Sequence, residues 1–157
     1  MQAATARTKE HQVVYCGLEV LRLIGERIES CDEVDREDLR VVLEFMREVA
    51  HRCLDNTEDI LRVASMEQRL ASHRRVRSLF DELARTEGPD FVAACRLYTD
   101  ILSQSILEDR LCVAVMDCDP ETLGQFYEWE RETDVRARQH GQTLHRLEMK
   151  YTNPHCI

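Results

Sequence analysis

The spacing of apolar residues constrains this chain most, because they recur every three or four positions through long stretches with few helix breakers. Only 5 Gly and 3 Pro occur in 157 residues, so few turns can form and the elements must be few and long. This spacing places apolar side chains on one face of an α-helix, whereas a half-buried strand requires strict alternation. The sequence therefore predicts an all-α protein.

Capping and breaking residues divide the chain into five expected helices. Asp35 and Asp90 are expected to cap the second and fourth helices, and Gly88-Pro89 is expected to end the third. Asp119 and Pro120 are expected to begin the fifth. The expected helices span residues 5–29, 36–64, 67–87, 91–116 and 120–150, with turns near residues 30–35, 65 and 88–90.

The short connections between these helices determine the expected topology. Long helices joined by short connections must run antiparallel to their neighbours. We therefore predict an up-down-up-down antiparallel four-helix bundle with an additional C-terminal helix. A chain of 157 residues is expected to form one domain, covering residues 1–157.

The composition argues against several classes of function. A formal net charge of -9 disfavours binding to a nucleic-acid backbone, which requires Lys and Arg. No apolar run approaches the roughly 20 residues that cross a bilayer, and the first residues lack the apolar segment of a signal peptide. The 7 Cys form no CxxC pair, which favours reduced thiols in a cytoplasmic protein. No motif of an enzyme active site is found, so an enzyme is not expected.

Four polar residues fall on or near the apolar faces of the first four expected helices: His11, Glu58, His73 and Asp109. His11 and His73 each follow the start of their helix by about six residues, and Glu58 and Asp109 precede the end of theirs by about the same. In an antiparallel bundle these starts and ends lie together. The four side chains are therefore expected to converge in one layer.

Two imidazoles and two carboxylates inside a bundle form either a metal site or a hydrogen-bonded polar cluster, because a buried carboxylate needs a partner. Ligands of this kind suit iron, manganese or zinc. The spacing leaves both interpretations open. Tyr15 and Tyr98 fall on or near inward faces, where each is a candidate to hydrogen-bond into the layer.

Four segments resemble the helices of bacterial hemerythrin-like domains, also called HHE cation-binding domains, over about residues 5–117. The second helix is represented by CDEVDREDLRVVLEFMREVAHRCLDNTEDILRVA, and the first by KEHQVVYCGLEVLRLIGERIE. SHRRVRSLFDEL resembles the third helix, including a His-x-x-x-Arg pattern at His73 and Arg77, and YTDILSQSILEDRLCVAVMD resembles the fourth. The expected fifth helix is compatible with the C-terminal helix of that family.

The resemblance implies a set of metal ligands. His11 and His73 correspond to ligand histidines, and Arg77 to a residue that supports them. The family carries a His-x-x-x-Glu motif in its second and fourth helices, where this chain has Leu54 with Glu58 and Ser105 with Asp109. Two imidazoles are thus replaced, by Leu54 and Ser105. Asp55 and Asp59 offer an alternative register in the second helix.

The family uses this layer for a non-haem di-iron centre that binds oxygen or nitric oxide or serves iron handling. The resemblance therefore implies a binding or sensory module with a degenerate metal centre, holding iron or another divalent metal through His11, Glu58, His73 and Asp109. The first alternative is a metal-free bundle that acts as a structural or protein-interaction domain. The second is a functional di-iron protein for oxygen or nitric oxide. The sequence names neither a protein partner nor an oligomeric state.

Overall fold

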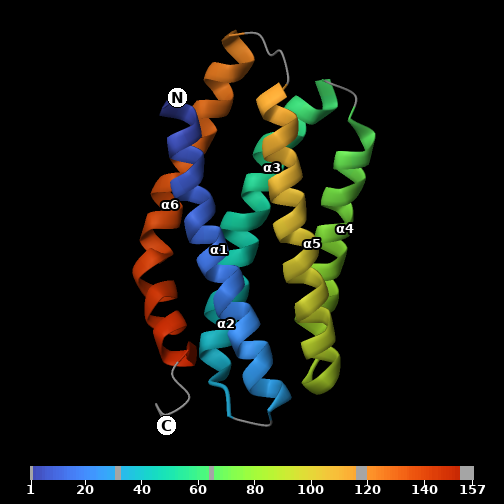
Figure 1. Cartoon of the computed structure of the whole chain (residues 1–157), viewed down its shortest axis with the longest axis vertical. Helices are drawn as coiled ribbons and strands as arrows, with labels where there is room; N and C mark the ends of the chain where they lie inside the picture. The colour runs from blue at the N-terminus through green and yellow to red at the C-terminus, as the bar shows by residue number, and fades with distance from the viewer. Residues whose placement is uncertain (1, 31–32, 64–65, 116–119, 153–157) are drawn as a thin grey trace.

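A computed structural model describes the backbone of residues 2–30, 33–63, 66–115 and 120–152 (Figure 1). Some side chains within these helices, including that of His11, lie outside the described residues. The elements are α1 (Gln2–Glu29), α2 (Arg36–Phe45), the π-helix η1 (Met46–Ala50), α3 (His51–Val63), α4 (Glu67–Arg85), α5 (Gly88–Val115) and α6 (Pro120–Thr152). All elements of the described part of the chain are helical, as the sequence predicts.

In the described part of the chain the helices form five long rods that run roughly along the long axis of the molecule (Figure 1). α2, η1 and α3 make up a single rod, because they follow one another without a break. α1 packs against both α6 and α5, and α4 packs against α5 and α3. α3 also contacts α6, which brings the C-terminal helix alongside the second rod. The α3, α4 and α5 helices are therefore neighbours, and they contribute the polar residues described below.

The core follows the apolar faces that the sequence predicts. Every predicted inward residue of α4 is buried, and most of those of α1 and α5 are buried as well. Close packing of such side chains supplies the main stabilisation of a helical protein. Fully buried members from different rods include Leu21, Ile24, Phe45, Met46, Leu54, Phe80, Leu83, Tyr98 and Leu102.

The second expected helix is interrupted by the π-helix η1, which the sequence did not predict. The core side chains Phe45 and Met46 stand at its start, opposite Gly17 of α1. A Cβ on Gly17 would lie 2.5 Å from Cε1 of Phe45 and 2.6 Å from Cε of Met46. Because Gly17 has no side chain, α1 can pack closely against the junction between α2 and the π-helix η1.

Several predicted boundaries are close to those observed, and one is wrong. The side chain of Asp35 caps α2 by accepting a hydrogen bond from the amide of Glu37 at 2.9 Å. Asp90, by contrast, lies in the first turn of α5 and does not cap it. α4 ends at Arg85, and Gly88, which adopts the left-handed φ of 58, is the first residue of α5, where Pro89 suits the first helical turn. The predicted cap Asp119 and the turn at residue 65 lie outside the described residues.

Candidate functional site

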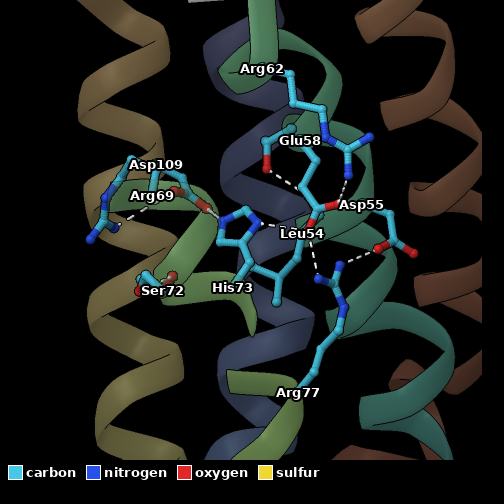
Figure 2. A network of polar contacts seen from close by, with 11 residues as sticks. Leu54, Asp55, Glu58, Arg62, Arg69, Ser72, His73, Arg77 and Asp109 are labelled. Atoms are coloured by element: carbon cyan, nitrogen blue, oxygen red, sulfur yellow. Dashed lines mark hydrogen bonds and ion pairs between the residues drawn. The ribbon is translucent and has the colours of Figure 1, made fainter. Parts of the chain in front are cut away.

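The imidazole of His73 lies between two carboxylates, one from each neighbouring helix (Figure 2). Its Nδ1 is 3.2 Å from Oε1 of Glu58 on α3, and its Nε2 is 2.6 Å from Oδ2 of Asp109 on α5. His73 is fully buried, and the side chain of Asp109 is only 5% exposed. Both distances are within hydrogen-bond range, so both ring nitrogens have a partner.

The helix ends explain why these three residues meet. Glu58 precedes the end of α3 by little more than one turn, and His73 follows the start of α4 by a similar distance. Asp109 precedes the end of α5 in the same way. The structure therefore brings together Glu58, His73 and Asp109, which the sequence places in one layer. His11 belongs to the same prediction, but its side chain lies outside the described residues.

An arginine from α4 pairs with Glu58. Nη1 of Arg77 is 2.6 Å from Oε1 of Glu58, and its Nη2 contacts Asp55. Arg62, one turn along α3, places Nη2 3.6 Å from the other oxygen of Glu58. Arg77 thus contacts the layer as the sequence suggests, but it holds the carboxylate through a direct ion pair.

A second arginine of α4 stands beside Asp109 (Figure 2). Nη1 of Arg69 lies 3.7 Å from Oδ1 of Asp109, while its Nη2 contacts Glu108. This distance is short enough for an ion pair but too long for a hydrogen bond. Nη1 of Arg69 and Oδ1 of Asp109 are both buried and have no hydrogen-bond partner. Arg69 therefore neutralises Asp109 by charge and leaves one carboxylate oxygen without a hydrogen bond.

The sequence carries a signal for this arrangement that is independent of the apolar faces. Arg69, His73 and Arg77 repeat at intervals of four along α4, so they lie in one row on its surface. The row faces Glu58 on one side and Asp109 on the other. Arg62 likewise lies four residues after Glu58, at the spacing of an ion pair within a helix.

The described residues do not fit a divalent metal. A histidine ligand offers one nitrogen to the metal and uses the other to donate a hydrogen bond, whereas both nitrogens of His73 already contact carboxylates. Each carboxylate also has a guanidinium beside it, in the position where a cation would add repulsion. Among the described residues, no group of three or more His, Cys, Asp or Glu side chains is placed to hold a metal ion.

Leu54 and Ser105, which the resemblance matches to ligand histidines, are both buried. Leu54 is 1% exposed and lies beside the network in Figure 2. Ser105 is also 1% exposed, and its hydroxyl lies 3.3 Å from that of Ser72. Of the alternative register, Asp55 is exposed and pairs with Arg77, while the side chain of Asp59 lies outside the described residues.

The two tyrosines considered as partners of the layer lie elsewhere. Tyr15 is 37% exposed on α1, and Tyr98 is fully buried with its hydroxyl 3.0 Å from Nε2 of His51. His51 follows the π-helix directly and stacks edge-on against Phe80, with ring centroids 4.7 Å apart. His51 is therefore partly buried against these rings and is not a solvated surface residue. Tyr98 therefore belongs to a second cluster with His51 and Phe80.

Burial controls the chemistry of this second cluster. It lowers the pKa of His51 to about 4, and the positive charges of Arg77 and Arg47 act in the same direction. Burial also raises the pKa of the Tyr98 phenol above its ordinary value. His51 is thus a neutral imidazole at neutral pH, which can accept a hydrogen bond from the Tyr98 hydroxyl.

Cys16 and Cys95 do not offer a reactive thiolate. Burial raises the pKa of both Cys16 and Cys95 to about 12, and the carboxylate of Glu148 adds to the effect at Cys16. The thiolate is the nucleophilic form, so both thiols are poorly reactive at neutral pH. Cys16, Cys95 and Cys112 are free cysteines.

The fold and the site define an all-helical protein with a buried network of one histidine, two carboxylates and flanking arginines. Comparisons with protein-family models, with curated proteins and with solved structures give no match for this chain. No helix in the described part of the chain combines the length and apolar character needed to span a bilayer. The buried network is therefore the feature of this chain that bears on its function.

Proposed function

We propose that this chain is a metal-independent relative of the hemerythrin-like domains that acts as a structural or protein-interaction module. In this proposal α1, the α2–η1–α3 rod, α4 and α5 form an antiparallel four-helix bundle, with α6 as the additional helix. The observation that carries it is that carboxylates engage both nitrogens of His73, while arginines pair with those carboxylates.

The charges of the network support this proposal. Glu58 and Asp109 bring two negative charges into a mostly buried layer, where each needs compensation. In a metal centre the cation supplies that compensation. Here Arg69 and Arg77 supply it, and a guanidinium keeps its charge at any ordinary pH. A divalent metal would have to displace both.

Two further observations support an interaction role in a reducing compartment. Leu97, Leu107 and Leu111 of α5 are exposed large apolar residues, a kind of residue that often contributes to protein contacts. The three cysteines with described side chains are free, as thiols are in the cytoplasm. A protein partner and a cytoplasmic location are thus part of the proposal.

A reduced metal centre is the second candidate, and one observation favours it. Oδ1 of Asp109 is buried and has no hydrogen-bond partner, so one oxygen of the layer still has a free acceptor position. A metal bound there would take Glu58, His73 and Asp109 as ligands, with His11 as the fourth that the sequence suggests. It would supply Lewis-acid or redox chemistry, depending on the ion.

Metal analysis of protein purified without chelator, together with an optical spectrum, distinguishes the two candidates. We expect iron, manganese and zinc far below one equivalent, and an unchanged unfolding temperature when EDTA is added. One equivalent of metal that Asp109→Asn releases would overturn the proposal and support the reduced metal centre.

An Arg69→Gln/Arg77→Gln double variant provides the matched comparison. Without these two guanidiniums, Asp109 loses its ion pair with Arg69, and Glu58 keeps the longer ion pair with Arg62. We therefore expect this variant to bind Zn(II) more tightly than the wild-type protein in a competition assay. Equal affinity would show that the arginines are not what excludes a metal.

A further inference from the structure

A groove of about 350 Å³ lies between α4 and α5 and is lined in part by Arg69. Gln68, Ser72 and Arg75 follow one another along α4 at intervals of four and three, so they form one wall. Ile101, Ser105 and Glu108 form the facing wall on α5. The groove is lined by side chains of mixed polarity, and it shares Arg69 with the His73 network.

Small side chains explain why this space is not filled. Ala71 and Ser72 of α4 face Ser105 of α5, where larger residues would interdigitate and close the gap. The hydroxyls of Ser72 and Ser105 lie 3.3 Å apart, so the two helices stay in contact along this line. One hydroxyl can donate to the other, which leaves a second hydroxyl hydrogen available to an acceptor.

The groove is locally positive in a protein whose formal net charge is -9. Arg69 and Arg75 line it with a single acidic residue, Glu108, which leaves one excess positive charge. Glu108 is already occupied, because it pairs with Arg69 and its Oε1 accepts a hydrogen bond from the Gln104 amide at 3.0 Å. Arg75 is exposed, and no ion pair is found for it within the described residues.

We propose that this groove binds a small molecule through an oxyanion, either a carboxylate or a phosphate group. The Arg75 guanidinium offers a planar set of donors that suits both kinds of oxyanion. The Ser72 hydroxyl, one turn away, and the Gln68 amide add neutral donors on the same wall. Ile101 gives the rest of the molecule an apolar contact.

Arg69 connects this groove to the buried network. Its guanidinium pairs with Glu108 at the groove and with Asp109 beside His73. An oxyanion in the groove attracts Arg69 and competes with both carboxylates for it. Binding is therefore expected to change the surroundings of the His73 imidazole, although the ligand does not touch it.

The test is an NMR titration of the full chain with inorganic phosphate and, separately, with acetate, with sodium chloride as the ionic-strength control. We expect saturable shifts of the Gln68, Ser72 and Arg75 amides with at least one of the two anions and not with chloride. The His73 ring signals should shift in the same titration. The anion that binds more tightly identifies the preferred headgroup.

Three charge variants locate the site. Arg75→Gln should weaken binding about tenfold, because it removes a charge-assisted contact. Glu108→Gln should strengthen binding, since it removes the only acidic group that lines the groove. Arg74→Gln makes the same change of charge one residue away, outside the groove, and should leave affinity within about twofold.

Absence of saturable shifts with both anions in a folded protein would overturn this proposal. So would equal losses in Arg75→Gln and Arg74→Gln, because these would indicate general charge attraction. Metal content is measured separately, so either result leaves the metal-independent proposal to its own test.

Discussion

Nε2 of His73 lies 2.6 Å from Oδ2 of Asp109, and both side chains are almost completely withdrawn from water. A short hydrogen bond at this depth is strong, but each polar group also loses its hydration when it is buried. Separating the two side chains would leave both buried without this hydrogen bond, which costs free energy. The pair therefore fixes α4 relative to α5 at the height of His73 and Asp109.

Asp109→Asn should lower the free energy of unfolding by about 1.5–3 kcal/mol, because it weakens a buried charge-assisted hydrogen bond and removes the charge beside Arg69. Glu108→Gln is the neighbouring control, since its side chain is 37% exposed, and it should cost less than about 1 kcal/mol. Urea unfolding of both variants measures the difference. Equal losses would show that the buried pair contributes no more than the surface one.

Leu54→His together with Ser105→His should raise affinity for Fe(II) above that of the wild-type protein. The double variant restores a histidine one turn before Glu58 and another one turn before Asp109. Fe(II) titration followed by optical spectroscopy measures the gain. A folded double variant with no gain in iron would show that the residues matched to the family motif are wrong.

Stability should fall as the pH drops from about 6.5 to about 4, in part through His51. Its pKa is about 4 in the folded protein against an ordinary 6.5, so only the unfolded chain takes up a proton in this interval. The contribution of His51 is absent above pH 6.5 and reaches at most about 3 kcal/mol of destabilisation near pH 4.

His51→Gln separates this effect from the titration of carboxylates. The amide cannot titrate, so the variant should lose less stability than the wild-type protein over the same interval. The exposed His145 provides the control, and His145→Gln should keep the wild-type slope. Guanidinium unfolding at several pH values measures all three slopes. Parallel slopes for His51→Gln and the wild-type protein would rule out this role of His51.

Gly17→Ala should destabilise the protein by about 1–3 kcal/mol, because the new methyl group would collide with Phe45 and Met46. Gly124→Ala makes the same substitution in α6, where a Cβ meets nothing within 4 Å. It should stabilise the helix by about 0.5–1 kcal/mol. Thermal unfolding of the pair measures the opposite signs. Stabilisation by both would show that α1 can move away from the π-helix at little cost.

The sequence predicted the helical class and the meeting of Glu58, His73 and Asp109 because both depend on spacing along helices. Apolar periodicity sets which face is buried, and distance from a helix end sets the height of a residue. Apolar periodicity and distance from a helix end can both be obtained without knowing side-chain rotamers. Together they predict that Glu58, His73 and Asp109 lie at the same height along the helices.

The arginines that complete the network could not be predicted in the same way. Arg69 and Arg77 are long side chains at the edge of the core, and their contacts depend on the rotamers that neighbouring helices allow. The contact of His51 with Tyr98 depends on the rotation that the π-helix introduces just before it. Regular periodicity contains no information about such a local change.

The π-helix Met46–Ala50 also affects how this chain can be compared with others. A π-helix closes each hydrogen bond over one more residue than an α-helix, so a single π-helical turn holds one extra residue within an otherwise α-helical rod. Deleting one residue between Met46 and Ala50 would restore an uninterrupted α-helix, in which the buried face of α2 would continue in register into α3. An alignment to a straight helix that matches α2 therefore requires a one-residue gap here, and without it Glu58 is compared with the wrong position.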